Sequence, residues 1–198
     1  MAEKDSIVIA GGGPVGMVAA LGLWRAGVPV VVLDAHDEPF EDQRAASLHP
    51  PTVEMLDALG LARDIIAAGL LSPTYHFRDR ASQDLVAAFD LGTLAGELRY
   101  PFVVQYEQYK LVDFILAHLE GAADLEMRFS TAVTDIAQSG DGVVVTVENP
   151  DGDEEKLAAD YVIGCDGGRS MVRKCAAIDF PGFTYPERFL KIATDFDF

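Results

Sequence analysis

The chain has 198 residues, of which 49% are apolar and 24% charged, and this composition is typical of a globular protein rather than a disordered one. The length suffices for one well-buried domain, or for one domain with a small appendage. The net charge of −17 argues against nucleic acid or an anionic membrane as a partner, because an acidic surface repels phosphate groups. The two cysteines, Cys165 and Cys175, have no metal-ligand spacing around them, so we expect reduced thiols in a cytoplasmic protein and no metal site.

The first 36 residues predict a strand, a helix and a second strand. Residues 6–11, "SIVIAG", form a continuous β-branched run, as expected for a strand buried on both faces. Residues 14–27, "PVGMVAALGLWRAG", have helical periodicity and end on Gly27, a residue type that commonly follows a helix. Residues 28–36, "VPVVVLDAH", predict the second strand. The apolar stretch after Lys4 is broken by "GGGP" and has no cleavage site after it, so we expect neither a signal peptide nor a membrane span.

The glycines between the first strand and the helix match the pattern G-x-G-x-x-G as Gly11, Gly13 and Gly16. Gly11 allows the tight turn, Gly13 lets a pyrophosphate approach the backbone, and Gly16 lets the helix pack close to the sheet. Pro14 and Val15 complete the turn and begin the helix, whose free N–H groups and partial positive charge suit phosphates.

Asp34 ends the second strand, 23 residues after Gly11, where a carboxylate can accept hydrogen bonds from a ribose; Ala35 follows it. The glycine pattern alone could be a simple turn. Its position between strand and helix, together with Asp34, favours a dinucleotide site at the end of the sheet.

Two later stretches bear on which dinucleotide binds. Arg44 precedes an amphipathic helix with Val53, Leu56 and Leu59 on one side, although a lone arginine there is usually a solvated charge. Residues 161–165, "YVIGC", predict a buried strand that leads into "DGG" and a short helix with two basic residues. The segment "CDGG" on its own indicates only a turn.

The middle of the chain predicts antiparallel structure. Residues 71–97 contain strand-like pieces, and Tyr75, His76 and Phe77 could line a pocket, although an aromatic triplet in a strand more often serves packing. Residues 125–164 read as a β-meander with turns at "GDG" and "PDGDEE", which we expect to cover the parallel sheet.

Together the glycine pattern, Arg44 and the segment "CDGGRSMVRK" resemble the flavoprotein aromatic hydroxylases, the para-hydroxybenzoate hydroxylase-like monooxygenases. The resemblance covers nearly the whole chain. It implies an α/β, Rossmann-like FAD-binding fold with a parallel sheet, a β-meander and the start of a substrate-binding β-sheet. It further implies that residues 1–70 and 98–178 form a discontinuous FAD-binding domain, and that residues 71–97 and 179–198 form part of the substrate sheet. Because family members are about twice this length, the chain resembles their N-terminal portion.

The resemblance also assigns cofactor-binding residues. Arg44 matches an arginine near the pyrophosphate, and Asp166 with Gly167 matches a segment linked to both FAD and NAD(P)H. Gln108, favoured over Gln105 by the positions of the leucine-type residues that follow, matches a glutamine that hydrogen-bonds the cofactor. Val133 matches a position whose backbone meets the adenine end. One departure is Asp34, because the family usually has glutamate there and aspartate is a shorter acceptor.

The implied activity is hydroxylation of a phenolic or other small aromatic substrate with NAD(P)H and O₂ through a flavin C4a-hydroperoxide. No residue is assigned as catalytic. Two alternatives stay open: an FAD-dependent reductase or dehydrogenase of the same fold, and a truncated non-catalytic module that binds nucleotide. A homodimer is compatible with the resemblance.

Overall fold

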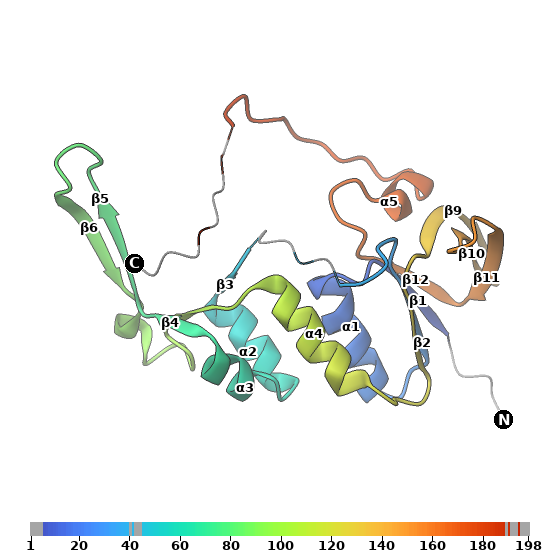
Figure 1. The fold of residues 1–198 in the computed structure, drawn as a ribbon, viewed down its shortest axis with the longest axis horizontal. Helices are drawn as coiled ribbons and strands as arrows, with labels where there is room; N and C mark the ends of the chain where they lie inside the picture. Colours follow the sequence, from blue (N-terminus) through green and yellow to red (C-terminus); the bar gives the residue numbers. More distant parts are fainter. Residues whose placement is uncertain (1–5, 40, 42–44, 189, 191–193, 195–198) are drawn as a thin grey trace. The chain divides into compact units, whose positions relative to one another are not determined.

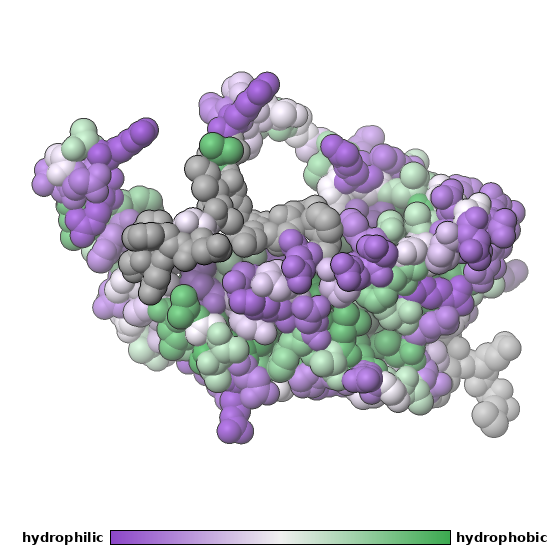
Figure 2. All heavy atoms as spheres, viewed as in Figure 1, coloured by the Kyte–Doolittle hydropathy of each residue, from purple (hydrophilic) through white to green (hydrophobic). Residues whose placement is uncertain are grey.

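The computed structural model describes residues 6–39, 41, 45–188, 190 and 194. The chain divides into two compact units, and the first combines residues up to 43 with residues from 119 onward, whereas the second contains residues 44–118. On the face shown in Figure 2, hydrophilic residues are spread over the described surface, as the composition predicts. In the described part of the chain, no helix is long and apolar enough to cross a membrane.

The first unit is built on a four-stranded parallel sheet (Figure 1). Its strands are, in spatial order, β12 (Tyr161–Gly164), β1 (Ile7–Ala10), β2 (Val30–Leu33) and β8 (Leu125–Arg128). Strands β1 and β2 come from the first 33 residues, whereas β8 and β12 come from residues 125–164, so distant parts of the sequence share one sheet. The predicted strands at residues 6–11 and 28–36 are confirmed, with shorter bounds. The strand predicted at residues 161–165 also forms, but it is not buried as predicted, because it lies at the edge of the sheet with Tyr161 exposed.

Helix α1 (Pro14–Arg25) packs against β1 and β2. The predicted helix is confirmed, and Gly27 adopts a left-handed conformation with φ of 76° just beyond its end. Its buried stripe consists of Met17, Ala20 and Leu21, whereas Val18 is only half-buried. The stripe therefore follows the i, i+3, i+4 pattern of an amphipathic helix.

A β-meander covers the parallel sheet, as predicted, but it is shorter than the predicted range of residues 125–164, because residues 125–128 and 161–164 pair in parallel with β2 and β1. Its antiparallel strands are β9 (Ala132–Ser139), β10 (Gly142–Glu148) and β11 (Glu154–Ala159). Val145 and Val147 of β10 share a buried cluster with Val8 of β1 and Leu33 of β2. This apolar layer accounts for the alternating pattern of residues 143–147, because alternate side chains point into it.

A short helix, α5 (Met171–Cys175), follows β12 and contacts both β12 and β9. The described residues beyond α5 contain neither helix nor strand. The assignment of residues 179–198 to a substrate sheet therefore stays a prediction.

The second unit contains a small antiparallel sheet in the order β3 (Ser47–Leu48), β7 (Val103–Gln105), β4 (Leu70–Ser72). Its helices are α2 (Pro50–Ala58), α3 (Ala62–Ala68), the 3-10 helix η1 (Leu91–Leu94) and α4 (Gln108–Leu119), whose last residue belongs to the first unit. Helix α2 buries Val53 and Leu56, as predicted, and packs against α3, whereas Leu59 lies just beyond the end of the helix and is only half-buried. Gly60 has φ of 64° at the corner between them.

A two-stranded hairpin of β5 (Thr74–Arg78) and β6 (Leu85–Asp90) extends away from α2 and α3 within this unit (Figure 1). The rings of Phe77 and Phe89 meet edge to face across it, with centroids 5.7 Å apart. Both remain more than half exposed, at 58% and 57%. The strand-like pieces predicted at residues 71–97 thus form a hairpin, and its role in substrate binding stays a prediction.

Candidate functional site

The glycine turn between β1 and α1 forms one wall of the candidate site. Gly11 has φ of 105°, a conformation that L side chains rarely adopt, and a Cβ there would collide with the carbonyl oxygen of Cys165. A Cβ at Gly16 would likewise collide with the carbonyl oxygen of Gly11. These two glycines are required by the fold itself, because backbone occupies the space that a side chain would need.

Gly13 differs from the other two glycines of the pattern. Its φ of −69° and ψ of −178° are open to any residue, and a Cβ there would meet no atom within 4 Å. Nothing in the described protein therefore requires glycine at this position. An open space at the start of a helix suits a ligand that approaches the backbone closely.

The start of α1 is prepared for an anion. The first helical residue, Pro14, has no N–H, no side chain caps the helix, and its first turn contains no acidic residue. Val15 is 69% exposed beside this helix end. The N–H groups and positive dipole end are thus uncompensated within the described residues, although the chain as a whole is strongly acidic.

Asp34 links the end of β2 to the glycine turn. Its Oδ2 accepts a hydrogen bond from the backbone N–H of Gly12 at 2.7 Å. Its Oδ1 accepts one from the backbone N–H of His36 at 2.9 Å and lies 2.8 Å from Nδ1 of the same residue. Neither Gly12 nor His36 is among the site residues predicted from the sequence. Ala35, which lies between Asp34 and His36 in the sequence, is exposed.

Asp166 lies next to this turn because β12 pairs with β1. The backbone N–H of Cys165 donates to the carbonyl of Ala10 at 2.7 Å, which brings the ends of the two strands together. Oδ2 of Asp166 accepts hydrogen bonds from the N–H groups of Met171 and Val172 at 2.6 and 3.2 Å and so caps α5. Gly167 follows in a left-handed conformation, with φ of 76°.

The other carboxylate oxygen of Asp166, Oδ1, is buried and has no hydrogen-bond partner among the described residues. An unsatisfied buried acceptor is costly, and its presence at this edge of the sheet calls for a donor from outside the described protein. Burial, and secondly the charge of Asp166, raise the pKa of the neighbouring Cys165 thiol. Cys165 is thus a neutral thiol near pH 7 rather than a nucleophile.

The residues present fit a dinucleotide such as FAD. The open space over Gly13 can take a pyrophosphate, and the orphaned Oδ1 of Asp166 can accept from a hydroxyl group. Among the described residues, no group of three or more His, Cys, Asp or Glu side chains is arranged to hold a metal ion.

The structure places the remaining predicted residues as follows. Val133 lies on β9 opposite Val147, and its side chain packs against the cluster between meander and sheet. Gln108 begins α4 in the second unit, with its backbone N–H donating to the carbonyl of Ala45 at 3.2 Å. Arg44 lies outside the described residues.

Gln108 and Gln105 differ in their side-chain partners. The side-chain oxygen of Gln105 accepts a hydrogen bond from Ser47 at 2.9 Å. The Gln108 side chain makes no hydrogen bond to the described part of the chain. The choice of Gln108 over Gln105 as the cofactor-binding glutamine stays a prediction.

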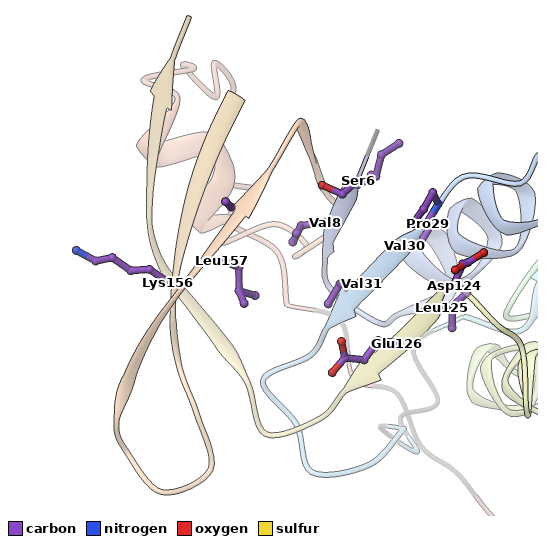
Figure 3. A pocket seen from close by; sticks show the side chains of 12 residues that line it. Ser6, Val8, Pro29, Val30, Val31, Asp124, Leu125, Glu126, Lys156 and Leu157 are labelled. Atoms are coloured by element: carbon purple, nitrogen blue, oxygen red, sulfur yellow. The ribbon is translucent and has the colours of Figure 1, made fainter. Parts of the chain in front are cut away.

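A separate cavity of about 470 Å³ lies at the opposite, amino-terminal edge of the parallel sheet (Figure 3). Val8, Val31 and Leu157 line it from the sheet and from β11, while the Lys156 side chain points away from it. Parallel α/β sheets bind ligands at the carboxyl ends of their strands, so this cavity is a packing feature between sheet and meander rather than part of the candidate site.

Comparison with known proteins agrees with this site. Residues 4–198 match the family described as FAD binding domain. The chain is 35% identical, over its whole length, to 6-hydroxy-3-succinoylpyridine 3-monooxygenase of Pseudomonas putida and covers 50% of that protein. It is 34% identical to dialkyldecalin synthase of Streptomyces rugosporus, over 90% of this chain and 36% of that protein.

Among solved structures, p-nitrophenol 4-monooxygenase of Pseudomonas putida superimposes with a TM-score of 0.87 and 34% identity, over 92% of this chain and 46% of that one. The chain spans half or less of the length of each of these relatives. Two of the three names describe monooxygenases, and the compounds they name carry an aromatic ring. The match over nearly the whole sequence shows that this chain belongs to the FAD binding domain family of the flavoprotein monooxygenases.

Proposed function

We propose that the chain binds FAD at the carboxyl edge of its parallel sheet, as the cofactor-binding part of an aromatic-ring monooxygenase. The observation that carries this proposal is the buried Oδ1 of Asp166, which lacks a partner among the described residues and lies next to the glycine turn. A hydroxyl of the bound cofactor would satisfy it.

The roles of the residues follow from their places. The N–H groups at the start of α1, together with the space over Gly13, hold the pyrophosphate, and Asp34 accepts from the ribose of the adenosine half. Asp166 and Gly167 hold the flavin half. The proposal retains the other expected contacts, made by Gly11, Pro14, Val15, Gly16, Ala35, Arg44, Gln108 and Val133.

When bound, FAD supplies the redox chemistry, in which NAD(P)H is the reductant, O₂ the oxidant and a small phenolic compound the acceptor of a hydroxyl group. The hydroxylation route implied by the family resemblance belongs to the same proposal. The residues of this chain bind and orient the cofactor. We propose that residues 71–97 and 179–198 form part of the substrate-binding sheet. The free thiols of Cys165 and Cys175 are compatible with a cytoplasmic protein. A homodimer is compatible with the proposed function.

A second candidate is a flavin-binding protein that does not hydroxylate. It is favoured by the relative named dialkyldecalin synthase, whose name describes no oxygenation although it is about as similar to this chain as the monooxygenase. The residues described here bind the cofactor, and one cofactor site supports several chemistries.

The decisive experiment is titration of the flavin-free chain with FAD and, separately, with NAD, followed by fluorescence. We expect FAD to bind and NAD to bind far more weakly; the reverse order would contradict the proposal. O₂ consumption is then measured with NADH and NADPH, with and without phenolic acids. If O₂ consumption requires a phenolic acid, the result supports the hydroxylase. If FAD binds but neither NADH nor NADPH reduces it, the result supports the second candidate.

A further inference from the structure

The carboxylate of Asp34 already has three donors in the protein. Oδ2 accepts from the N–H of Gly12, and Oδ1 accepts from the N–H of His36 and lies 2.8 Å from the ring nitrogen Nδ1 of His36. The Asp34 side chain is 16% exposed, whereas the His36 side chain is 52% exposed. The histidine ring thus contacts the carboxylate without being buried.

These contacts determine which acceptor site remains. A carboxylate has about four lone-pair sites, two on each oxygen. The two His36 donors occupy both sites on Oδ1, and Gly12 occupies one site on Oδ2. One site on Oδ2 is left for a donor from a ligand.

We propose that His36 is a positioning residue for the cofactor. Its Nδ1–H holds Oδ1 of Asp34 and so directs the remaining acceptor site of Oδ2 toward a hydroxyl of the adenosine ribose. This inference rests on the proposed binding of FAD and deepens it, because it assigns a role to a residue that does not itself touch the cofactor. Aspartate is short and accepts from the backbone on both sides of the site, so its orientation depends on these partners.

The position of the donor nitrogen provides the test. In asparagine the amide nitrogen is bonded to Cγ, as Nδ1 is in histidine, whereas in glutamine it lies one bond farther out, as Nε2 does. The backbone N–H of residue 36 remains in every variant, so His36→Asn, His36→Gln and His36→Ala keep its hydrogen bond to Oδ1 and differ in the side-chain donor offered to Asp34.

The experiment measures the dissociation constant of FAD for the parent and the three variants by fluorescence titration of the flavin-free chain. We expect His36→Ala and His36→Gln to bind FAD about 3- to 10-fold more weakly, as for loss of one hydrogen bond, and His36→Asn to bind like the parent. The thermal midpoints of all flavin-free forms should agree closely, because the ring is half exposed. Equal affinities for the Asn and Gln variants would overturn the proposal.

A double variant tests whether His36 acts through Asp34. In the background of Asp34→Ala, we expect His36→Ala to have no further effect on the affinity for FAD. Additive effects would show that the histidine acts elsewhere and would contradict the proposal. If the parent itself does not bind FAD, the proposed function fails, which is a result distinct from any pattern among the variants.

Discussion

The carboxylate of Asp34 and the backbone N–H of Gly12 are joined by a 2.7 Å hydrogen bond between the end of β2 and the turn after β1. Gly12 is buried, and a Cβ there would lie 2.7 Å from Cε of Met127 and 3.1 Å from Oδ2 of Asp34. The proposed ribose acceptor is thus also a structural brace of the pyrophosphate turn.

This double role predicts a loss of stability in the absence of cofactor. Asp34→Ala leaves the buried N–H of Gly12 without its acceptor, so the free energy of unfolding of the flavin-free chain should fall by about 1–3 kcal/mol. Urea denaturation measures this change. The control is Asp37→Ala, at an exposed position nearby, which should stay within about 0.5 kcal/mol of the parent. Equal stabilities for both variants would show that the brace contributes nothing.

For Gly13 we expect substitutions to leave the stability of the flavin-free chain nearly unchanged and to weaken the binding of FAD. The free protein has room for a Cβ at this position, so Gly13→Ala and Gly13→Val should fold with a circular dichroism spectrum close to that of the parent. Both variants should lose affinity for FAD, with valine the more severe, because the side chain occupies the space of the pyrophosphate. Purification of either variant with full flavin content would disprove this role.

Gly22 in the same helix supplies the matched control for Gly13. A Cβ at Gly22 also meets no atom within 4 Å, and the residue lies in the interior of α1. Gly22→Ala should therefore stabilise the chain by about 0.5–1 kcal/mol through helix propensity and leave the affinity for FAD unchanged.

The sequence predicted the framework of the site because its signals are local. The apolar runs of β1 and β2 and the glycine spacing define strand, turn and helix, and the turn signals of the meander mark where β9 and β10 end. By contrast, the contact of Asp34 with Gly12 depends on side-chain rotamers and on the path of a turn. No periodicity encodes these features, although "DAH" after a buried strand does place a second polar side chain beside the acceptor.

Likewise, a sequence motif predicted Asp166 as a site residue, but it did not predict that the two carboxylate oxygens have different surroundings. One oxygen caps α5 while the other is left unsatisfied, and this depends on where Met171 and Val172 begin the helix.

The Arg44 prediction follows from the family resemblance. If its guanidinium contacts the pyrophosphate, Arg44→Ala should weaken FAD binding roughly 10- to 100-fold, as for loss of a charge-assisted hydrogen bond. Arg44→Lys should restore only part of the affinity, because an ammonium lacks the planar fork. Arg63→Ala, at an exposed position on α3, controls for the change in net charge. Equal dissociation constants for all four proteins would make Arg44 a solvated surface charge.

The raised pKa of Cys165 predicts slow alkylation. Only the thiolate reacts, and a raised pKa lowers its fraction at any pH below that value, so the folded Cys175→Ser variant should react with iodoacetamide more slowly at pH 8 than the same variant unfolded in urea. The ratio of the two rates should approach one as the pH rises and the folded thiol also ionises. Equal rates at pH 8 would contradict the effect of burial.

Oδ2 of Asp166 caps α5, whereas Oδ1 is the proposed acceptor for the cofactor, so the two contacts can be tested separately. In Asp166→Asn the amide oxygen can keep the bonds from the N–H groups of Met171 and Val172, so the flavin-free chain should lose less than about 1 kcal/mol of stability. The amide nitrogen then takes the place of the orphaned Oδ1, and a charge-assisted contact to a cofactor hydroxyl becomes a neutral one. The affinity for FAD should therefore fall by about 5- to 10-fold.

Ser170 provides the control for Asp166, since its hydroxyl caps the same helix by accepting from the N–H of Arg173 at 3.0 Å. Ser170→Ala should lower the free energy of unfolding by about 1 kcal/mol and leave the affinity for FAD unchanged. Urea denaturation and FAD titration on both variants thus give opposite patterns if Oδ1 faces the cofactor. If Asp166→Asn binds FAD like the parent, the buried oxygen has another partner, and the observation that carries the proposed function is lost.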